Sequence, residues 1–422
     1  MDKHYDSFFD ETYYTETLDN GLKVVIFHKP LFNTTACAFG TPYGALKINQ
    51  KIKNKEYHFH PGIAHFLEHK LFESQGDDMM NLFSSYGANV NAFTSYKETV
   101  YYFTKTGEGI EECLNLLLDF VQDLHITDKS VEKEKGIIYQ EVSMYEQNPD
   151  SRLINETYKS LYKNNPIKFD IGGDKESVYA ISKKELEECY KLNYHPSNML
   201  LCITTFMDPN KIIKIVKDNQ SKKHFKKFNK IESANLQEPT KPVKTRHTFK
   251  MPINTNKHLL AIKVNEDFKD EYEAFKMEWC YRFLFEVHFS PINKKYQKWL
   301  DDKIINDFFG YEIDFDLNCA YMMFYIENND ETVLKKLVEE SLKEKIINEE
   351  ILTQIKRRNI GIMFNSFSDV ESFTLGYTRD KLEGLDVFKE FEILNNITLE
   401  DVENCQKKLS FAQSSYISMI KK

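Results

Sequence analysis

Hydrophobic and polar positions repeat along the chain in one order. Residues 99–103 alternate as a strand does, and residues 110–121 place apolar side chains at helical spacing. Residues 320–324 and 331–342 repeat this strand and this helix, each 221 positions further on. A strand and a helix that recur at one fixed offset predict an internal duplication.

Two further features set the expected domain limits. Residues 197–201 and 414–418 have the pattern of a closing strand for each copy, and residues 221–244 are polar and lysine-rich. We therefore predict an α+β protein made of two tandem homologous α/β-sandwich domains, each an antiparallel-rich sheet with helices packed on it. The expected limits are residues 1–220 for the first domain, 221–244 for a linker and 245–422 for the second domain.

Composition agrees with two folded domains. A chain of 422 residues is too long for one ordinary core, and 41% hydrophobic residues with 32 Phe and 24 Tyr exclude global disorder. No apolar run approaches the roughly 20 residues that span a bilayer, and residues 1–6 lack the basic-then-apolar order of a signal peptide. Seven cysteines without a CxxC pair indicate reduced, mostly buried thiols. We expect a cytoplasmic protein.

Charge narrows the class of partner. The formal net charge is −9, whereas phosphate binding requires a basic surface, so nucleic acid is not the expected partner. The lysines within residues 222–227 lie in the expected linker and are interpreted as a solvated surface.

The chemistry is concentrated at residues 65–69, with the order His-Phe-Leu-Glu-His. Positions four apart share one face of a helix, so His65 and His69 can present two imidazoles to one metal ion. Glu68 lies one turn after His65, where a general base would take a proton from a zinc-bound water. This order reverses the zincin motif and is the inverzincin signature.

A catalytic zinc usually takes a third protein ligand. Glu134 and Glu141 are seven positions apart, about two helical turns, and therefore face the same way. We predict that Glu141 is the third ligand and that Glu134 is a supporting acid that orients a ligand or a substrate group. Composition alone would make both residues part of a solvated helix face, because charged neighbours surround them.

With these residues in place, the chain resembles the pitrilysin/insulinase family of zinc peptidases. The motif His65, Glu68 and His69, the pair Glu134 and Glu141, and the segments 62–64, 70–73, 87–95 and 194–199 carry the resemblance. It is strong in the N-terminal half and weak in the C-terminal half.

The resemblance implies a pitrilysin/processing-peptidase-like fold, one Zn²⁺ ion, and an endopeptidase for short or unfolded peptides. Glu68 would be the general base. Asn91, Ala92 and Phe93 would lie on an edge strand that binds the substrate mainly through its backbone.

The family also implies a partner, because its active members enclose the substrate between two such two-domain halves. The half opposite the zinc supplies an Arg and a Tyr seven residues apart. Here the corresponding stretch, residues 296–307, has no Arg and no correctly spaced Tyr, although Tyr311 lies nearby. The chain thus resembles the zinc-bearing subunit of a bacterial two-subunit branch, and we expect a homologous heterodimer partner, with a homodimer as the alternative.

Other histidines have ordinary interpretations. His58 and His60 precede Pro61 and are expected in the loop before the zinc helix. His195 is expected in a structural loop or at a strand start. An offset of 221 from His65 and His69 leads to Glu286 and Ser290, so no second metal site is expected.

A different class of function remains as the alternative. The chain could be a non-catalytic interaction subunit of a peptidase-like complex that has kept the fold. A structural zinc site would usually have four protein ligands and would not need the base Glu68.

Overall fold

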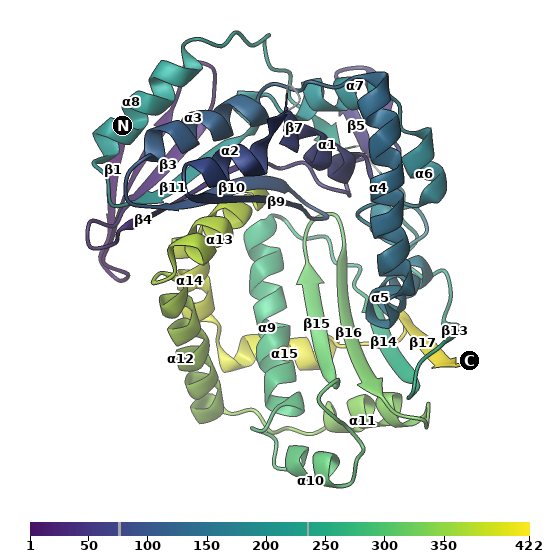
Figure 1. Ribbon diagram of the computed structural model, residues 1–422. Helices are drawn as coiled ribbons and strands as arrows, with labels where there is room; N and C mark the ends of the chain where they lie inside the picture. Colours follow the sequence, from purple (N-terminus) through teal and green to yellow (C-terminus); the bar gives the residue numbers. More distant parts are fainter. Residues whose placement is uncertain (75–76, 234–235) are drawn as a thin grey trace. The chain divides into compact units, whose positions relative to one another are not determined.

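The structure is a computed structural model that describes residues 1–74, 77–233 and 236–422. The chain forms two compact units (Figure 1). The first unit comprises residues 1–142, 170–235 and 362–388, and the second comprises residues 143–169, 236–361 and 389–422. Each unit therefore includes a segment from the other half of the sequence. The limits predicted from sequence stay a prediction, and residues 234 and 235 of the expected linker lie outside the described residues.

The first unit is built on a seven-stranded sheet with the order β1-β2-β3-β11-β4-β10-β9. Its strands are β1 (Asp2–Asp6), β2 (Glu11–Thr17), β3 (Lys23–His28), β11 (Leu200–Thr205), β4 (Thr34–Thr41), β10 (Thr99–Thr106) and β9 (Ala88–Thr94). Strands β3 and β11 run parallel, and all other neighbours run antiparallel. Strand β9 ends the sheet, so one side of its backbone faces away from the other strands.

Helices cover both faces of this sheet. Helices α1 (Ile63–Phe72), α2 (Met79–Ser85) and α3 (Ile110–Val121) pack over strands β9, β10 and β4. Helix α13 (Val370–Glu383) packs on β4 and β11 from the other face (Figure 1). Helix α3 buries an apolar stripe that includes Leu114, Leu117 and Phe120. Each such buried side chain contributes roughly 1.5–3 kcal/mol.

Shorter elements complete the first unit. They are β5 (Asn49–Ile52), β6 (Lys55–His58), β12 (Glu232–Ser233), β7 (Glu73–Ser74), β8 (Asp77–Asp78), α6 (Lys175–Ala180), α7 (Lys183–Asn193), η2 (Pro196–Asn198) and α8 (Pro209–Gln220). The closing strand β11 begins at Leu200 and not at residue 197 as predicted, because Pro196 starts the turn η2.

The second unit repeats the same sheet. Its strands are β13 (Arg246–Met251), β17 (Ser414–Lys421), β14 (Lys257–Lys263), β16 (Ala320–Glu327) and β15 (Gly310–Phe315), in that order. This order matches β3-β11-β4-β10-β9, including the single parallel pair, here β13 with β17. The pair Thr94–Thr99 and the pair Phe315–Ala320 are 221 positions apart, so the register repeats as well. The predicted duplication is confirmed.

The helices of the second unit show an exchange between the two halves. Helix α9 (Glu271–Phe289) packs on β15 and on α15 (Leu399–Lys408), and α11 (Val333–Ser341) packs on β14 and β16. Helix α5 (Pro149–Leu161), from the N-terminal half, packs on β14 and β17, as α13 packs on β4 and β11. Each sheet is thus covered by one helix from the other half of the sequence.

The remaining helices are α4 (Asp128–Gln147), α10 (Tyr296–Asp301), α12 (Glu349–Ser366), α14 (Val387–Asn396) and the short η1 (Pro166–Lys168). All seven cysteines are buried thiols, as predicted. Among the described residues, no helix has the length and apolar character needed to cross a membrane.

Candidate metal centre

Helix α1 presents the predicted motif on its polar face. Its other face is buried and consists of Ile63, Ala64, Phe66, Leu67 and Leu71. Burial of that face leaves His65, Glu68 and His69 half-buried. The helix begins after Gly62, whose φ of 89° is left-handed; a Cβ there would lie 2.4 Å from the carbonyl oxygen of Gly172. This close approach requires glycine and fixes the start of the helix.

Three side chains converge on one point. The candidate ligand atoms of His65, His69 and Glu141 all lie within 4.8 Å of one another. The Oε1 atom of Glu141 is 3.7 Å from Nε2 of His65, and its Oε2 atom is 3.4 Å from Nε2 of His69. Ligands about 2.0–2.2 Å from a tetrahedral zinc ion are separated by roughly 3.3 Å. Two imidazoles and a carboxylate at these separations fit a zinc ion, and helix α4 supplies the carboxylate.

Glu134 lies behind the site on the same helix as Glu141. Its Oε1 atom is 3.0 Å from Nδ1 of His69, a hydrogen bond that leaves Nε2 of His69 directed toward Glu141. Its second oxygen is 3.4 Å from Nζ of Lys70, whose fully buried side chain also pairs with Glu73. Glu134 therefore occupies the place of an acid that orients a ligand and fixes its tautomer.

Interactions among the charged groups change the protonation of the candidate ligands. Burial by itself would lower the pKa of His69, but hydrogen bonds to Glu134 and Glu141 outweigh it and raise this pKa to about 9. The hydrogen bond with His69 lowers the pKa of Glu141; burial opposes the same effect at Glu134 but does not cancel it. Burial, followed by repulsion from His69, lowers the pKa of His65. In metal-free protein at neutral pH, His69 therefore carries a proton between two carboxylates.

Zinc binding is expected to depend on pH for this reason. Zinc must displace the His69 proton below a pH of about 9, so the apparent affinity should rise about tenfold per pH unit from pH 7 and level off near pH 9. Titration calorimetry in buffers of different ionisation enthalpy would measure the proton released. An affinity independent of pH between 7 and 9, with no proton released, would contradict this assignment.

The candidate base is tied to the edge strand. The Oε2 atom of Glu68 accepts a 2.6 Å hydrogen bond from Oγ1 of Thr94, the last residue of β9. Sequence analysis gave no role to Thr94 or to Lys70. Thr94 could have been identified from the alternation of side chains along a strand, which puts its side chain on the same face as that of Ala92.

The predicted substrate segment lies on strand β9. Ser95 N–H donates to the carbonyl of Glu98 at 2.8 Å, which makes these residues a hydrogen-bonded pair. Pairing alternates along an antiparallel ladder, so the N–H and C=O groups of Ala92 and Thr94 point to the open edge. The outward N–H of Ala92 donates to Oδ1 of Asn91 at 2.8 Å.

Phe93 is on the opposite face of β9 from Thr94. Its ring lies 6.4 Å from the ring of Tyr102 and 5.7 Å from the guanidinium carbon of Arg379. The structure thus brings the motif helix and this strand together through Thr94, while the Phe93 side chain belongs to the other face of the sheet.

His58, His60 and His195 have partners outside the metal centre. His60 pairs with Glu185 at 3.0 Å, and Nε2 of His195 lies 2.7 Å from the carbonyl oxygen of Lys226. His58 lies 2.8 Å from Asn49 and ends strand β6, so its predicted place in a loop was wrong. His288 is buried in α9.

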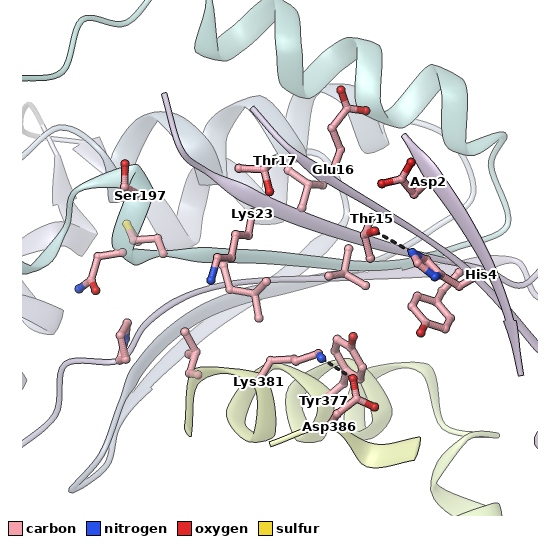
Figure 2. A pocket seen from close by; sticks show the side chains of 18 residues that line it. Asp2, His4, Thr15, Glu16, Thr17, Lys23, Ser197, Tyr377, Lys381 and Asp386 are labelled. Carbon is pink, nitrogen blue, oxygen red and sulfur yellow. Dashed lines mark hydrogen bonds and ion pairs between the residues drawn. The ribbon is translucent and has the colours of Figure 1, made fainter. Parts of the chain in front are cut away.

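A separate pocket opens in the first unit. It has a volume of about 510 Å³ and is lined by residues of β1, β2, β3 and α13 with the segment around Ser197 (Figure 2). Figure 2 shows His4 directed toward Thr15 and Lys381 directed toward Asp386. The Nε2 atom of His4 lies 2.8 Å from Oγ1 of Thr15. None of its lining residues belongs to α1, α4 or β9. The candidate metal centre is therefore identified by its convergent donor atoms and not by this pocket.

Comparison with known families covers both halves of the chain. The family model for insulinase (peptidase family M16) matches residues 54–175 and includes the motif helix, strand β9 and Glu141. A second model, the peptidase M16 inactive domain, matches residues 180–359.

Individual relatives agree with these matches. The chain is 35% identical over 399 residues to the uncharacterized zinc protease YmfH of Bacillus subtilis, covering 93% of each chain. It is 27% identical over 205 residues to the probable mitochondrial-processing peptidase subunit beta of Schizosaccharomyces pombe, covering 48% of this chain and 43% of the relative. The structure of a putative M16-like peptidase from Alicyclobacillus acidocaldarius superposes with a TM-score of 0.92 at 30% identity, covering 98% and 99% of the two chains.

Proposed function

The chain belongs to the insulinase family, peptidase family M16, and from this membership we propose that it is a zinc-dependent endopeptidase that cleaves short or unfolded peptides. One observation carries the proposal: His65, His69 and Glu141 converge on one point. A hydrogen bond from Thr94 also ties Glu68 to the edge strand β9. A zinc site, a base and a strand for the substrate are then close together.

In the proposed reaction, His65, His69 and Glu141 would hold one zinc ion. Zinc bound there would polarise the scissile carbonyl and lower the pKa of water to about 7. Glu68 takes the proton from the attacking water and later gives it to the leaving amine. The Thr94 hydroxyl holds the Glu68 carboxylate in place at 2.6 Å.

Two supporting residues keep His69 in its orientation. Glu134 accepts a hydrogen bond from the Nδ1–H of His69, so that Nε2 is free to act as a ligand. The ammonium group of Lys70 balances the charge of Glu134 in a buried position. Because Lys70 balances its charge, Glu134 can stay ionised and leave the proton on Nδ1 of His69.

The substrate is proposed to add to the open edge of β9 as a further strand. Backbone pairing gives affinity with little dependence on sequence, and a folded protein has no free strand to offer, so short or unfolded chains are suitable substrates. In the structure the Ala92 N–H donates a hydrogen bond to the side chain of Asn91. A carbonyl group of the bound peptide would take the place of that side chain as the acceptor.

Replacement of Ala92 by Pro is expected to weaken peptide binding broadly. The Ala92 N–H points away from the sheet, so proline removes no ladder bond there and the fold should persist. Loss of one backbone hydrogen bond to the substrate should raise KM about tenfold. Peptide hydrolysis, zinc content and circular dichroism would be measured together.

Phe93→Ala is the matched control for Ala92→Pro. It keeps every backbone group of the strand and should change the preference for substrate side chains without a general loss of binding. If Ala92→Pro folds, keeps its zinc and leaves KM unchanged, β9 is not the substrate strand.

A homologous partner chain is proposed to complete the active enzyme. Tyr311 lies in β15, and the residue seven positions before it is Ile304, so this chain lacks the Arg of the expected pair. One relative is named as a subunit of a peptidase, which supports an assembly of related chains. The partner would carry the Arg and the Tyr and would lack the zinc motif.

The purified zinc-loaded chain should therefore cleave peptides slowly until that partner is added. We expect at least about a hundredfold increase in turnover, because correct positioning of the substrate controls much of the barrier. A Glu68→Gln chain with the same partner is the control and should stay inactive. Robust cleavage by the chain alone, abolished by Glu68→Gln, would refute the need for a partner and would favour a homodimer or an active monomer.

A further inference from the structure

Two side chains of helix α9 close the open edge of strand β15. Nη2 of Arg282 donates to the carbonyl of Ile313 at 2.8 Å. A carboxylate oxygen of Glu278 accepts the N–H of Phe315 at 3.0 Å. Glu278 and Arg282, one helical turn apart, are paired with each other at 2.7 Å. One ion pair thus holds both a donor and an acceptor against the strand.

The capped groups are those that a further strand would use. Asp316 N–H donates to the carbonyl of Cys319 at 3.0 Å, which makes this a hydrogen-bonded pair. Because pairing alternates, the N–H and C=O groups of Ile313 and Phe315 point away from β16. The guanidinium and the carboxylate therefore stand where the N–H and C=O of an adjacent strand would stand.

The repeated fold supplies a direct comparison. Ile313 and Phe315 lie 221 positions after Ala92 and Thr94, in the same register on the counterpart strand β9. Among the hydrogen bonds of the described residues, no side chain bonds to the Ala92 carbonyl or the Thr94 N–H, and only the Asn91 side chain accepts the Ala92 N–H. One copy leaves its edge available, and the other copy covers it.

We propose that Glu278 and Arg282 act as a strand mimic that excludes peptides from β15, so that peptides dock on β9 beside the metal centre and not on its counterpart. The inference uses the proposed docking on β9 only to explain what the exclusion achieves. An exposed strand edge is a general template for pairing with other chains, and a covered edge prevents it. Arg282 is 38% exposed and Glu278 is 16% exposed, so the pair lies between the strand and solvent.

The test exposes the edge of β15 in a chain whose other edge strand, β9, can no longer bind peptide. The background carries Glu68→Gln to prevent turnover and Ala92→Pro to disable β9. Glu278→Ala and Arg282→Ala are then added together, so that neither partner of this ion pair is left alone. Binding of a fluorescently labelled unfolded peptide to the zinc-loaded chain is measured by anisotropy. We expect the opened variant to bind at least about tenfold more tightly than the background, because two backbone hydrogen bonds become available.

A second signal reports where the peptide binds. The guanidinium carbon of Arg282 lies 5.9 Å from the ring of Trp279, so docking at the opened edge should change the fluorescence of Trp279. The matched control removes the ion pair Lys335–Glu339, which has the same spacing on helix α11 and a separation of 3.8 Å. Lys335→Ala with Glu339→Ala should leave peptide binding at the level of the background.

The outcomes separate this inference from the proposed function. A folded opened variant that binds no more tightly than the background overturns the inference. If the double substitution does not fold, Arg282→Ala alone, which frees only the Ile313 carbonyl, replaces it and must still increase binding. If the opened β15 binds peptide while a Glu68→Gln chain with intact β9 and β15 does not, the exclusion is supported and the docking on β9 is wrong.

Discussion

Replacement of His65, His69 or Glu141 by Ala is expected to lower zinc content from about one ion per chain to less than about a tenth of that. The three ligand atoms lie within 4.8 Å of one another, and removal of one leaves two donors for a cation that usually takes three from the protein. Elemental analysis after gel filtration in metal-free buffer would measure the loss.

Glu134→Ala is the matched control on the same helix. Glu134 is hydrogen-bonded to Nδ1 of His69 and is not among the three convergent donors. Removal of such a supporting acid typically costs about 10–100-fold in activity or metal affinity, so most zinc should remain at saturating metal while turnover falls. Full zinc occupancy in Glu141→Ala would place the third ligand elsewhere.

Replacement of Glu68 by Gln is expected to remove turnover and to leave zinc in place. The amide oxygen of glutamine could still accept the hydrogen bond of Thr94, so the side chain should keep its position. An amide cannot take the proton of the attacking water, and loss of a general base lowers turnover by about 10²–10⁴. Glu68 is not among the three convergent donors, which is why the metal should remain.

Much of this site could be predicted from sequence because its geometry is local. The spacing of His65 and His69 places both on one helix face, and the two-turn spacing of Glu134 and Glu141 does the same on α4. The choice of Glu141 as the ligand needed the family resemblance as well, since spacing treats the two glutamates alike. The structure places Glu141 at the two histidines and Glu134 behind one of them.

Contacts between distant segments could not be predicted. The hydrogen bond from Thr94 to Glu68 and the ion pair of Lys70 with Glu134 join residues on different elements, and no periodicity marks them. The sequence also did not predict that α5 and α13 each pack on the sheet of the other half. An amphipathic pattern indicates that a helix has a buried face, but it does not indicate which sheet covers that face.

The offset of 221 shows how far a repeat can be used. It holds for the hairpin at the edge of each sheet, where β10 and β16 begin 221 positions apart, but not for β3 and β13, which begin 223 positions apart. The offset does not apply to the helices that pack on the edge strands, because α1 has 10 residues and its counterpart α9 has 19. The offset led to Glu286, which pairs with Arg358 at 2.8 Å, whereas Glu278 and Arg282 hydrogen-bond to the backbone of the edge strand.

The central claim is that this zinc site hydrolyses peptides with Glu68 as the base. The most direct test measures zinc content and peptide hydrolysis in the same samples of wild-type and Glu68→Gln chains, each with the homologous partner. We predict about one zinc ion per chain in both, rapid cleavage by wild type, and turnover lowered by about 10²–10⁴ in Glu68→Gln. Zinc-loaded wild type that cleaves no peptide, or a Glu68→Gln chain with wild-type turnover, would contradict the claim, and the first result would favour a non-catalytic interaction subunit.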